Sequence, residues 1–380
     1  MSYLKPYLGN TWISQRAAEH VQSVVQSNAV FRYTPESKYC RTVEALACQA
    51  LGVSHCLLVT NGTVALRAAL LALRPQPGQL VFIPSITFIA TANAVLNCGL
   101  VPVLVDVDEY GMLCPQALAK AIDLTPGRPL AAIAVHLEGA SAQLPAILEV
   151  CQRAGLHLVE DCAQGMGTTY EGRSVGSFGA FGCFSFQANK LLSSGEGGLL
   201  VSTDSTLFRR ASMLVDHGAE RTAQGYPDWS QSIGFGDNGK FNEIQAALLI
   251  AQFQGLTQLC ADLGAHYTEL RDLFPDDAIV QRPAGSVPVS VWLKRSQLAP
   301  SLRDLPWLYD WRAWDMPAHP ILGSRLSPYA DGFPWRLLEQ PLPDAQLNRH
   351  RPFLDERVCL PVPADDALFC VVRAEVAKRV

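Results

Sequence analysis

The stretch Phe184-Ser-Phe-Gln-Ala-Asn-Lys190-Leu-Leu-Ser-Ser-Gly-Glu-Gly-Gly198 places a single lysine between two apolar runs. The run that ends at Ser185 and the run at 199–201 both have the composition of buried strands. No acidic residue lies within three positions of Lys190, so no local salt bridge accounts for it. An amine among apolar and small residues loses hydration, which lowers its pKa and suits it to form a Schiff base with an aldehyde. For Lys190 alone, a solvated surface lysine is the alternative.

Two predicted strands upstream end in polar residues. The stretch Gly155-Leu-His-Leu-Val-Glu-Asp161 ends in an aspartate, the usual partner of a protonated pyridine nitrogen, although a helix N-cap is the alternative. His136 follows the apolar run 131–135, where ligands gather in open α/β sheets, and a structural histidine is the alternative there. Lys190 and Asp161 together are the minimal constellation for pyridoxal 5′-phosphate (PLP) chemistry. The sequence therefore predicts Lys190 and Asp161 as the catalytic residues.

A strand–turn–helix pattern predicts where the cofactor phosphate binds. Residues 55–60 have the composition of a strand, and Asn61-Gly62-Thr63 leads into a helix with an apolar face. A helix N-terminus offers free N–H groups and a positive dipole end, which suit a phosphate. Because Asn-Gly is also a common turn dipeptide, the assignment of Gly62 and Thr63 depends on the PLP lysine. We expect Ser185 to bind the same phosphate, and Gln164 either to hydrogen-bond the ring oxygen or to position the ring.

Composition favours a large α/β domain followed by a smaller one. Hydrophobic residues make up 49% of the 380 residues, enough for a buried parallel sheet. From residue 55, apolar runs alternate with amphipathic stretches, the pattern of β-α units. Thirteen of the 25 prolines lie in 283–363 and five of the seven tryptophans in 292–335, so we expect a change of domain before them. The predicted division is an N-terminal arm and large PLP-binding domain over 1–255 and a small domain over 256–380.

Several classes of protein are disfavoured by charge and pattern. A net charge of −5 offers no basic surface for nucleic acid, and no run of eighteen apolar residues predicts a membrane span. The first residues lack the layout of a signal peptide. Eleven dispersed cysteines without a Cys-x-x-Cys pair indicate reduced thiols in a cytoplasmic protein and predict no metal site. Cys162, beside Asp161, is expected to be a packing residue.

The sequence resembles the DegT/StrS family of sugar and aminocyclitol aminotransferases, which are fold-type I PLP enzymes. The resemblance is strong over about 25–260 and weak beyond. It rests on motifs that occur in the family's order, including the 29 positions from Asp161 to Lys190: Asn61-Gly-Thr-Val-Ala-Leu66, Pro84-Ser-Ile-Thr-Phe88-Ile-Ala-Thr91, Asp106-Val-Asp108, Val135-His-Leu-Glu-Gly139, Glu160-Asp-Cys-Ala-Gln164, Val175-Gly-Ser-Phe-Gly179, residues 184–198 and residues 238–248. It implies a mixed, mostly parallel sheet flanked by helices in a large domain, and a small α+β C-terminal domain.

The resemblance also implies further site residues and partners. It assigns Phe88 to stacking on the cofactor ring, whereas the residue type alone favours a core phenylalanine. It implies a homodimer with shared active sites, in which Asn238 contacts the cofactor phosphate of the other subunit. Lys240 stands where family members more often have arginine, a change that keeps the charge but loses bidentate geometry.

The implied reaction moves an amino group from glutamate or glutamine to a ketone of a sugar or cyclitol, in secondary-metabolite or cell-surface sugar biosynthesis. The glutamine at position 187 is similar to the residue in members that act on cyclitols, whereas members that act on nucleotide sugars often have histidine at this position. Arg32, Arg312 and Arg325 are candidates to bind a diphosphate. Two alternatives stay open: dehydratase or aromatising chemistry on the same fold, against which the lysine argues, and a non-catalytic regulatory protein.

Overall fold

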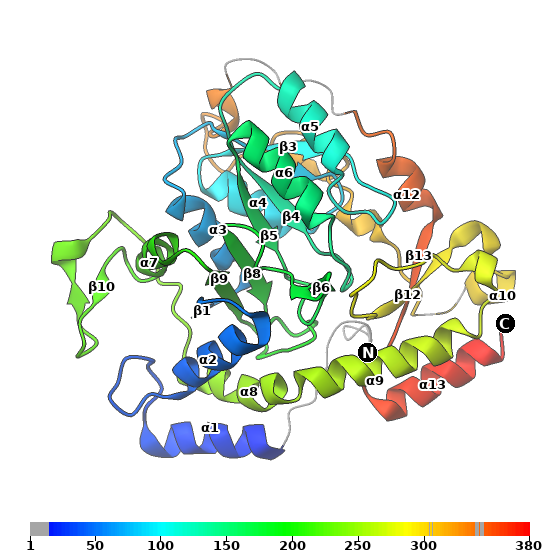
Figure 1. Ribbon diagram of the computed structural model, residues 1–380, viewed down its shortest axis with the longest axis horizontal. Helices are drawn as coiled ribbons and strands as arrows, with labels where there is room; N and C mark the ends of the chain where they lie inside the picture. Colours follow the sequence, from blue (N-terminus) through cyan, green and yellow to red (C-terminus); the bar gives the residue numbers. More distant parts are fainter. Residues whose placement is uncertain (1–14, 304, 306, 339–341, 343–345) are drawn as a thin grey trace.

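A seven-stranded sheet forms the centre of the molecule (Figure 1). The computed structural model describes residues 15–303, 305, 307–338, 342 and 346–380. The strand order is β1-β9-β8-β5-β4-β2-β3; β9 is antiparallel to both of its neighbours, and the other neighbouring pairs are parallel. The strands are β1 (His55–Val59), β2 (Leu80–Pro84), β3 (Val101–Val105), β4 (Pro129–Val135), β5 (His157–Asp161), β8 (Phe181–Ser185) and β9 (Gly198–Ser202). The predicted mixed, mostly parallel sheet is confirmed.

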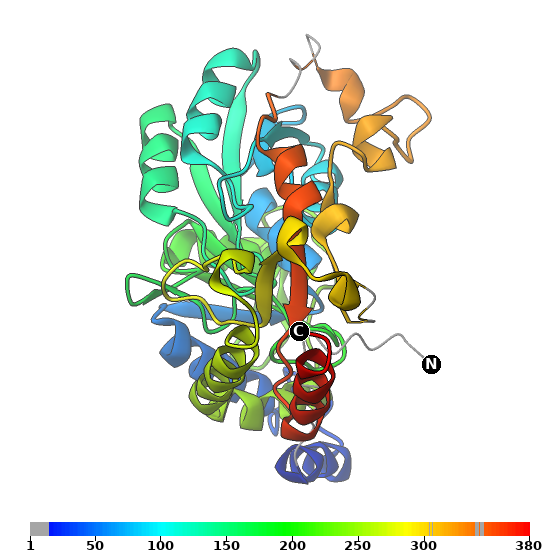
Figure 2. The same ribbon diagram turned by 90° about the vertical axis from the view of Figure 1, so that its right-hand side faces the viewer.

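Helices cover both faces of this sheet, which buries the strands almost completely. Helices α5 and α6 pack together on one face, beside β3, β4 and β5 (Figures 1 and 2). Helix α3 contacts both α4 and α7 and lies against β8 and β9, while α4 lies beside β2 and β3. The helices are α1 (Gln15–Ser27), α2 (Tyr39–Leu51), α3 (Gly62–Ala72), α4 (Ile89–Asn97), α5 (Pro115–Leu124), α6 (Leu144–Ala154) and α7 (Ser205–Leu214).

Two consecutive helices run along the edge of the molecule, with a bend between them (Figure 1). Helix α8 (Glu243–Gln254) ends at Gly255, and α9 (Leu256–Arg271) follows it directly. Helix α8 packs against α1 and α2. Within the described residues no single helix is both long and apolar enough to cross a membrane; only α8 and α9 counted together reach that length, and they are bent by 61°.

The C-terminal region has its own small sheet and core. Strand β12 (Ser290–Lys294), which the sequence did not predict, pairs antiparallel with β13 (Arg357–Pro361), and α9 packs beside α13 (Asp366–Ala377). Its hydrophobic core begins at Leu263 and ends at Val376. A division near residue 255 stays a proposal. The remaining short elements are β6 (Thr169–Tyr170), β7 (Arg173–Ser174), β10 (Glu220–Arg221), β11 (Pro227–Asp228), η1 (Trp229–Gln231), η2 (Asp276–Ala278), η3 (Arg295–Gln297), α10 (Pro300–Arg303), η4 (Trp311–Trp314), α11 (Pro320–Gly323), η5 (Trp335–Leu337) and α12 (His350–Glu356).

Part of the C-terminal region returns to the central sheet. The backbone of η4 meets the loop after β2, where the Thr87 amide donates to the Trp314 carbonyl (3.1 Å) and the Met316 amide donates to the Ser85 carbonyl (3.0 Å). Farther along, the Phe333 ring lies so close to Gly99 that an added Cβ there would come within 2.7 Å of it. The segment 311–338 therefore belongs to the wall of the large domain rather than to the small sheet.

Candidate active site

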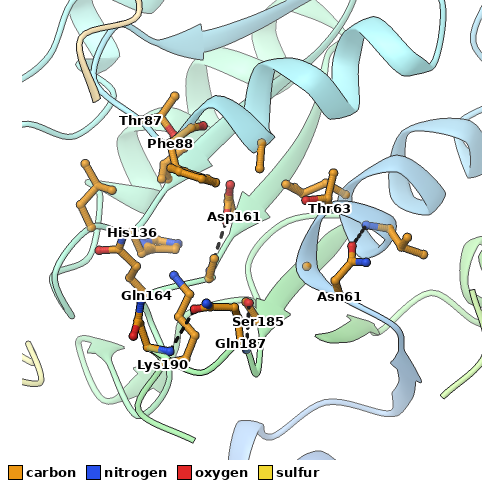
Figure 3. A pocket seen from close by; sticks show the side chains of 18 of the residues that line it. Asn61, Thr63, Thr87, Phe88, His136, Asp161, Gln164, Ser185, Gln187 and Lys190 are labelled. Carbon is orange, nitrogen blue, oxygen red and sulfur yellow. Dashed lines mark hydrogen bonds between the residues drawn. The ribbon is translucent and has the colours of Figure 1, made fainter. Parts of the chain in front are cut away.

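A cavity of about 620 Å³ lies where the carboxyl ends of the parallel strands meet. Ligands bind at this edge in open α/β sheets. Strands β1, β2, β4, β5 and β8 all point to it, and the loops that follow them supply most of its lining (Figure 3). The cavity brings together these predicted residues: Gly62, Thr63, Phe88, Asp161, Gln164, Ser185 and Lys190.

Lys190 lies in the loop between β8 and β9, as predicted. Its backbone amide donates to the Gln187 carbonyl (2.9 Å), and its side chain reaches into the cavity toward Asp161 (Figure 3). Loss of hydration lowers the pKa of the Lys190 amine, although the negative charges of Asp161 and Glu138 oppose the shift. A lysine of lowered pKa has more of the neutral amine that attacks an aldehyde.

Asp161 ends β5 with its carboxylate fixed from two sides. Thr91 Oγ1 donates to Asp161 Oδ2 (2.8 Å), and the Ala163 amide donates to Oδ1 (3.1 Å). Burial raises the pKa of Asp161, while these hydrogen bonds and the Lys190 charge oppose that rise. Thr91 was not predicted. It lies four positions after Thr87, which precedes α4 and whose hydroxyl lies 2.8 Å from its own, so this i, i+4 spacing was the available signal.

The N-terminus of α3 forms the other end of the cavity. Asn61 caps the helix by accepting the Val64 amide (2.8 Å), and the amides of Gly62 and Thr63 have no acceptor within the helix. Gly62 lies against β8, because an added Cβ would be 3.1 Å from the Ser185 Cβ. The Ser185 hydroxyl and two free amides therefore converge on one small volume.

Phe88 is 57% exposed and lies at the start of α4, on the cavity. The alternative of a core phenylalanine is therefore wrong. Figure 3 shows its ring on the opposite side of the cavity from Lys190. Its stacking on a cofactor ring stays a prediction.

Glu138 is a buried carboxylate beside the site that the sequence did not single out, although it lies in the quoted motif 135–139. It has a φ of 54°, uncommon for a residue other than glycine. Its amide donates to Gln164 Oε1 (2.9 Å), and its Oε2 accepts hydrogen bonds from the hydroxyls of Ser290 (2.7 Å) and Tyr309. Its Oε1 has no hydrogen-bond partner, and burial raises its pKa. Glu138 thus connects the C-terminal region to the neighbourhood of Lys190.

His136 also lines the cavity, but its nitrogens serve the fold. Nδ1 accepts the Ala142 amide (3.1 Å), which leaves Nε2 to donate to Glu160 (3.2 Å). Among the described residues, His136, Glu160 and Cys162 are the one group spaced to hold a metal ion. Glu160 already accepts the amides of 176, 178 and 179, so this group is a hydrogen-bonded structural network. The structural alternative for His136 is the better one.

The remaining candidates lie outside the cavity. Asn238 is exposed and forms a β-bridge with Asp216, which also binds Lys240 (2.8 Å). Although burial alone would raise the pKa of Asp216, the bonds from Arg221 and Lys240 hold it below its usual value. None of the three arginines proposed for a diphosphate lines the cavity: Arg32 is buried against Glu44, Arg312 is paired with Asp310, and Arg325 is exposed.

The sequence profile of the DegT/DnrJ/EryC1/StrS aminotransferase family matches residues 12–299. The chain therefore belongs to this family of aminotransferases, which depend on PLP.

Two curated relatives and one solved structure illustrate the match. A UDP-N-acetyl-3-dehydro-α-D-glucosamine 3-aminotransferase of Acidithiobacillus ferrooxidans is 42% identical over 217 residues, 57% of this chain and 56% of that protein. An L-glutamine:2-deoxy-scyllo-inosose aminotransferase of Micromonospora echinospora is 41% identical over 212 residues, 54% of this chain and 50% of that protein. The matches thus span about half the length of these relatives. An aminotransferase structure from Psychrobacter cryohalolentis superposes with a TM-score of 0.81 over 97% of both chains at 24% identity, a likeness of fold.

The geometry fits PLP at both ends of the cofactor. A buried carboxylate whose pKa is raised gains stability from a protonated ring nitrogen, and Asp161 offers it with both oxygens already oriented. The close approach of Gly62 to β8 leaves a cradle, with amides directed into it, that a side chain at 62 would fill. Lys190 lies in the same cavity as both groups.

Proposed function

We propose that this chain is a PLP-dependent aminotransferase that moves an amino group from glutamate or glutamine to a ketone of a sugar or cyclitol. The observation that carries the proposal is the meeting, in one cavity, of a lysine of lowered pKa and a fixed, buried aspartate. The names of the two curated relatives support the acceptor class, since one contains a dehydro-sugar and the other a keto-cyclitol.

The residues divide the chemistry between them. PLP supplies an aldehyde and a ring that withdraws electrons from the reacting carbon. Asp161 holds a proton on the ring nitrogen. The neutral Nζ of Lys190 takes the proton from the α-carbon of the amino donor and later delivers one to the former carbonyl carbon of the acceptor.

The other residues bind and orient. Amides of Gly62 and Thr63 and the Ser185 hydroxyl hold the phosphate, and Phe88 covers one face of the ring. Gln164, whose Oε1 is fixed by the Glu138 amide, keeps its side-chain NH₂ group free to donate to the ring substituents. These roles keep the reacting carbon beside Lys190, which is the positional contribution to the rate.

The proposal includes a homodimer with shared active sites. The segment 217–240 carries exposed large side chains, Tyr226 (72%), Trp229 (60%) and Phe235 (92%), and its hairpin β10–β11 projects from the body (Figure 1). Such a surface is costly in water unless another surface covers it. Asn238, on the same segment, is exposed and would contact the phosphate in the partner's site. A cytoplasmic location is also proposed, since all eleven cysteines lie among the described residues as free thiols.

The test is the half-reaction with the amino donor alone. Purified protein loaded with PLP is mixed with L-glutamate or L-glutamine, and the loss of the cofactor's visible band and the release of the keto acid are followed together. We expect one keto acid per active site, and none from Lys190→Ala. A protein that keeps its band without releasing keto acid would instead support the regulatory or dehydratase alternatives.

A further inference from the structure

We propose that Trp314 is the binding platform for the acceptor, and that the acceptor is an uncharged six-membered keto ring, a cyclitol or free sugar. The inference rests on the proposed function and specifies its substrate. Trp314 is a cavity-lining tryptophan of η4, and it lies beyond residue 299, where the match to the family ends. The family's shared motifs therefore say nothing about this part of the wall.

The backbone around Trp314 is fixed to the central sheet by a buried polar network. Asp315 forms a β-bridge with Ile86, and its Oδ1 is 2.9 Å from His350 Nε2. His350 Nδ1 in turn lies 2.9 Å from the Ser85 hydroxyl at the end of β2. His350, Asp315 and Ser85 are at most 8% exposed, so water does not compete for these bonds. The network holds residue 314 at the cavity before any ligand arrives.

The indole of Trp314 also packs against another aromatic ring. Its ring centroid is 5.5 Å from that of Trp311, which is fully buried and packs in turn against Trp292 (5.6 Å, edge to face) and Phe353 (5.1 Å). Gly111 allows this packing, because an added Cβ would lie 2.6 Å from both Trp311 and Phe353. A platform whose orientation is already set costs little entropy when a ligand stacks on it.

The chemistry of the wall matches a ring with one apolar face and a polar rim. An indole is a large flat apolar surface on which the C–H face of a polyhydroxylated ring can pack. Gln187 and Asn189 line the same cavity and have side-chain amides that can bond the hydroxyls at the rim. The Gln187 Oε1 accepts the Asn189 backbone amide (2.9 Å), which orients the Gln187 NH₂ group.

The charges of the cavity disfavour a second phosphate group beyond that of the cofactor. Of the described residues that line it, the cations are Lys190, which the cofactor uses, and Arg67, which is paired with Asp237. Glu196 adds an exposed carboxylate to the lining. A diphosphate placed here would add negative charge beside that carboxylate, and the described lining of one subunit offers no unpaired guanidinium to balance it.

The experiment separates binding of the acceptor from the chemistry at the cofactor. Wild type, Trp314→Ala, Trp314→Leu and Trp314→Phe are loaded with PLP and assayed with L-glutamine and 2-deoxy-scyllo-inosose, and the donor half-reaction is followed separately by absorbance. Trp335→Ala is the matched control, since it removes a tryptophan of the same segment that does not line the cavity. Melting temperatures check that each variant is folded.

We expect Trp314→Ala and Trp314→Leu to raise the KM for 2-deoxy-scyllo-inosose about tenfold, which corresponds to about 1.4 kcal/mol. Trp314→Phe keeps a flat ring and should stay within about threefold, and Trp335→Ala and every donor half-reaction should match wild type. An unchanged KM in Trp314→Leu would overturn the platform, and so would a slowed donor half-reaction. Wild type that completes the donor half-reaction but aminates UDP-N-acetyl-3-dehydro-α-D-glucosamine and not the cyclitol would overturn the uncharged acceptor. Failure of the donor half-reaction in wild type counts against the proposed function itself.

Discussion

The two ends of the cavity are built in different ways. The proposed cofactor end is made of residues at or soon after the ends of strands of one sheet, such as Asp161, the last residue of β5, and Lys190, in the loop after β8, so each position is set by local chain geometry. The proposed acceptor end depends on Trp314, which reaches the cavity through contacts with residues more than 200 positions away, such as Thr87. The first kind of site can be found in a sequence as motifs, and the second depends on tertiary packing.

The largest effect should come from the cofactor end. Lys190→Ala removes the amine that moves protons, so amine transfer should fall by about 10⁴-fold or more, the upper range for general acid–base catalysis. The measurement is turnover with saturating PLP and L-glutamine. Lys120→Ala, which removes an exposed lysine of α5, should behave as wild type. Activity of Lys190→Ala within tenfold of wild type would reject the catalytic assignment.

Asp161→Asn tests whether the carboxylate at the cofactor end lowers the stability of the fold while it supports turnover. The amide keeps the shape but loses the charge, so turnover should fall by about 10³-fold. Because burial raises the pKa of Asp161, this carboxyl lowers the stability of the fold at pH values above its ordinary pKa, where the unfolded chain loses the proton more readily than the folded one. The cofactor-free variant should therefore melt at the same or a higher temperature than cofactor-free wild type at pH 7. A lower melting temperature would show that Asp161 is needed for folding.

Glu138→Gln tests the contact between the two ends. The negative charge of Glu138 raises the pKa of the Lys190 amine, so its removal should lower that pKa further. Uptake of PLP by the cofactor-free protein needs the neutral amine, so the rate of uptake falls at low pH. In the variant this fall should occur about one pH unit lower, equivalent to about 1.4 kcal/mol. The rate of uptake is measured between pH 5 and 9 by absorbance, roughly the range in which a perturbed lysine titrates. A shift to higher pH, or none, would contradict the coupling.

The smallest effect is expected at Arg312, which lies at neither end of the cavity. Arg312 is half-exposed and paired with Asp310, away from the cavity. Arg312→Ala should leave the KM for 2-deoxy-scyllo-inosose within about twofold, as for a surface ion pair. A rise of tenfold for the nucleotide-linked acceptor alone would make Arg312 part of a diphosphate site, which the sequence had suggested.

The residues that the sequence assigned to the cofactor meet in one cavity, and they could be picked out because period and spacing are local properties. The strands that end at Asp161 and Ser185 were visible as apolar runs, and the helix after Asn61 as an amphipathic one. Phe88 was ambiguous, since residue type alone cannot distinguish a buried ring from one that covers a cavity. Helix α5 and strand β12 were missed. For Thr91 the only signal was its spacing from Thr87. Its bond to Asp161, like the contacts of Glu138 and Trp314, joins positions far apart in the chain, and one sequence carries no signal for such pairing.

The most direct test of the account is to trap the cofactor on the chain. Wild-type protein loaded with PLP is reduced with borohydride and digested, and its peptides are analysed by mass spectrometry. The account predicts one pyridoxyl phosphate adduct, on Lys190. It predicts no adduct there when excess L-glutamine has first converted all of the cofactor to its amine form. An adduct on another lysine, or a loaded protein without any adduct, would contradict it.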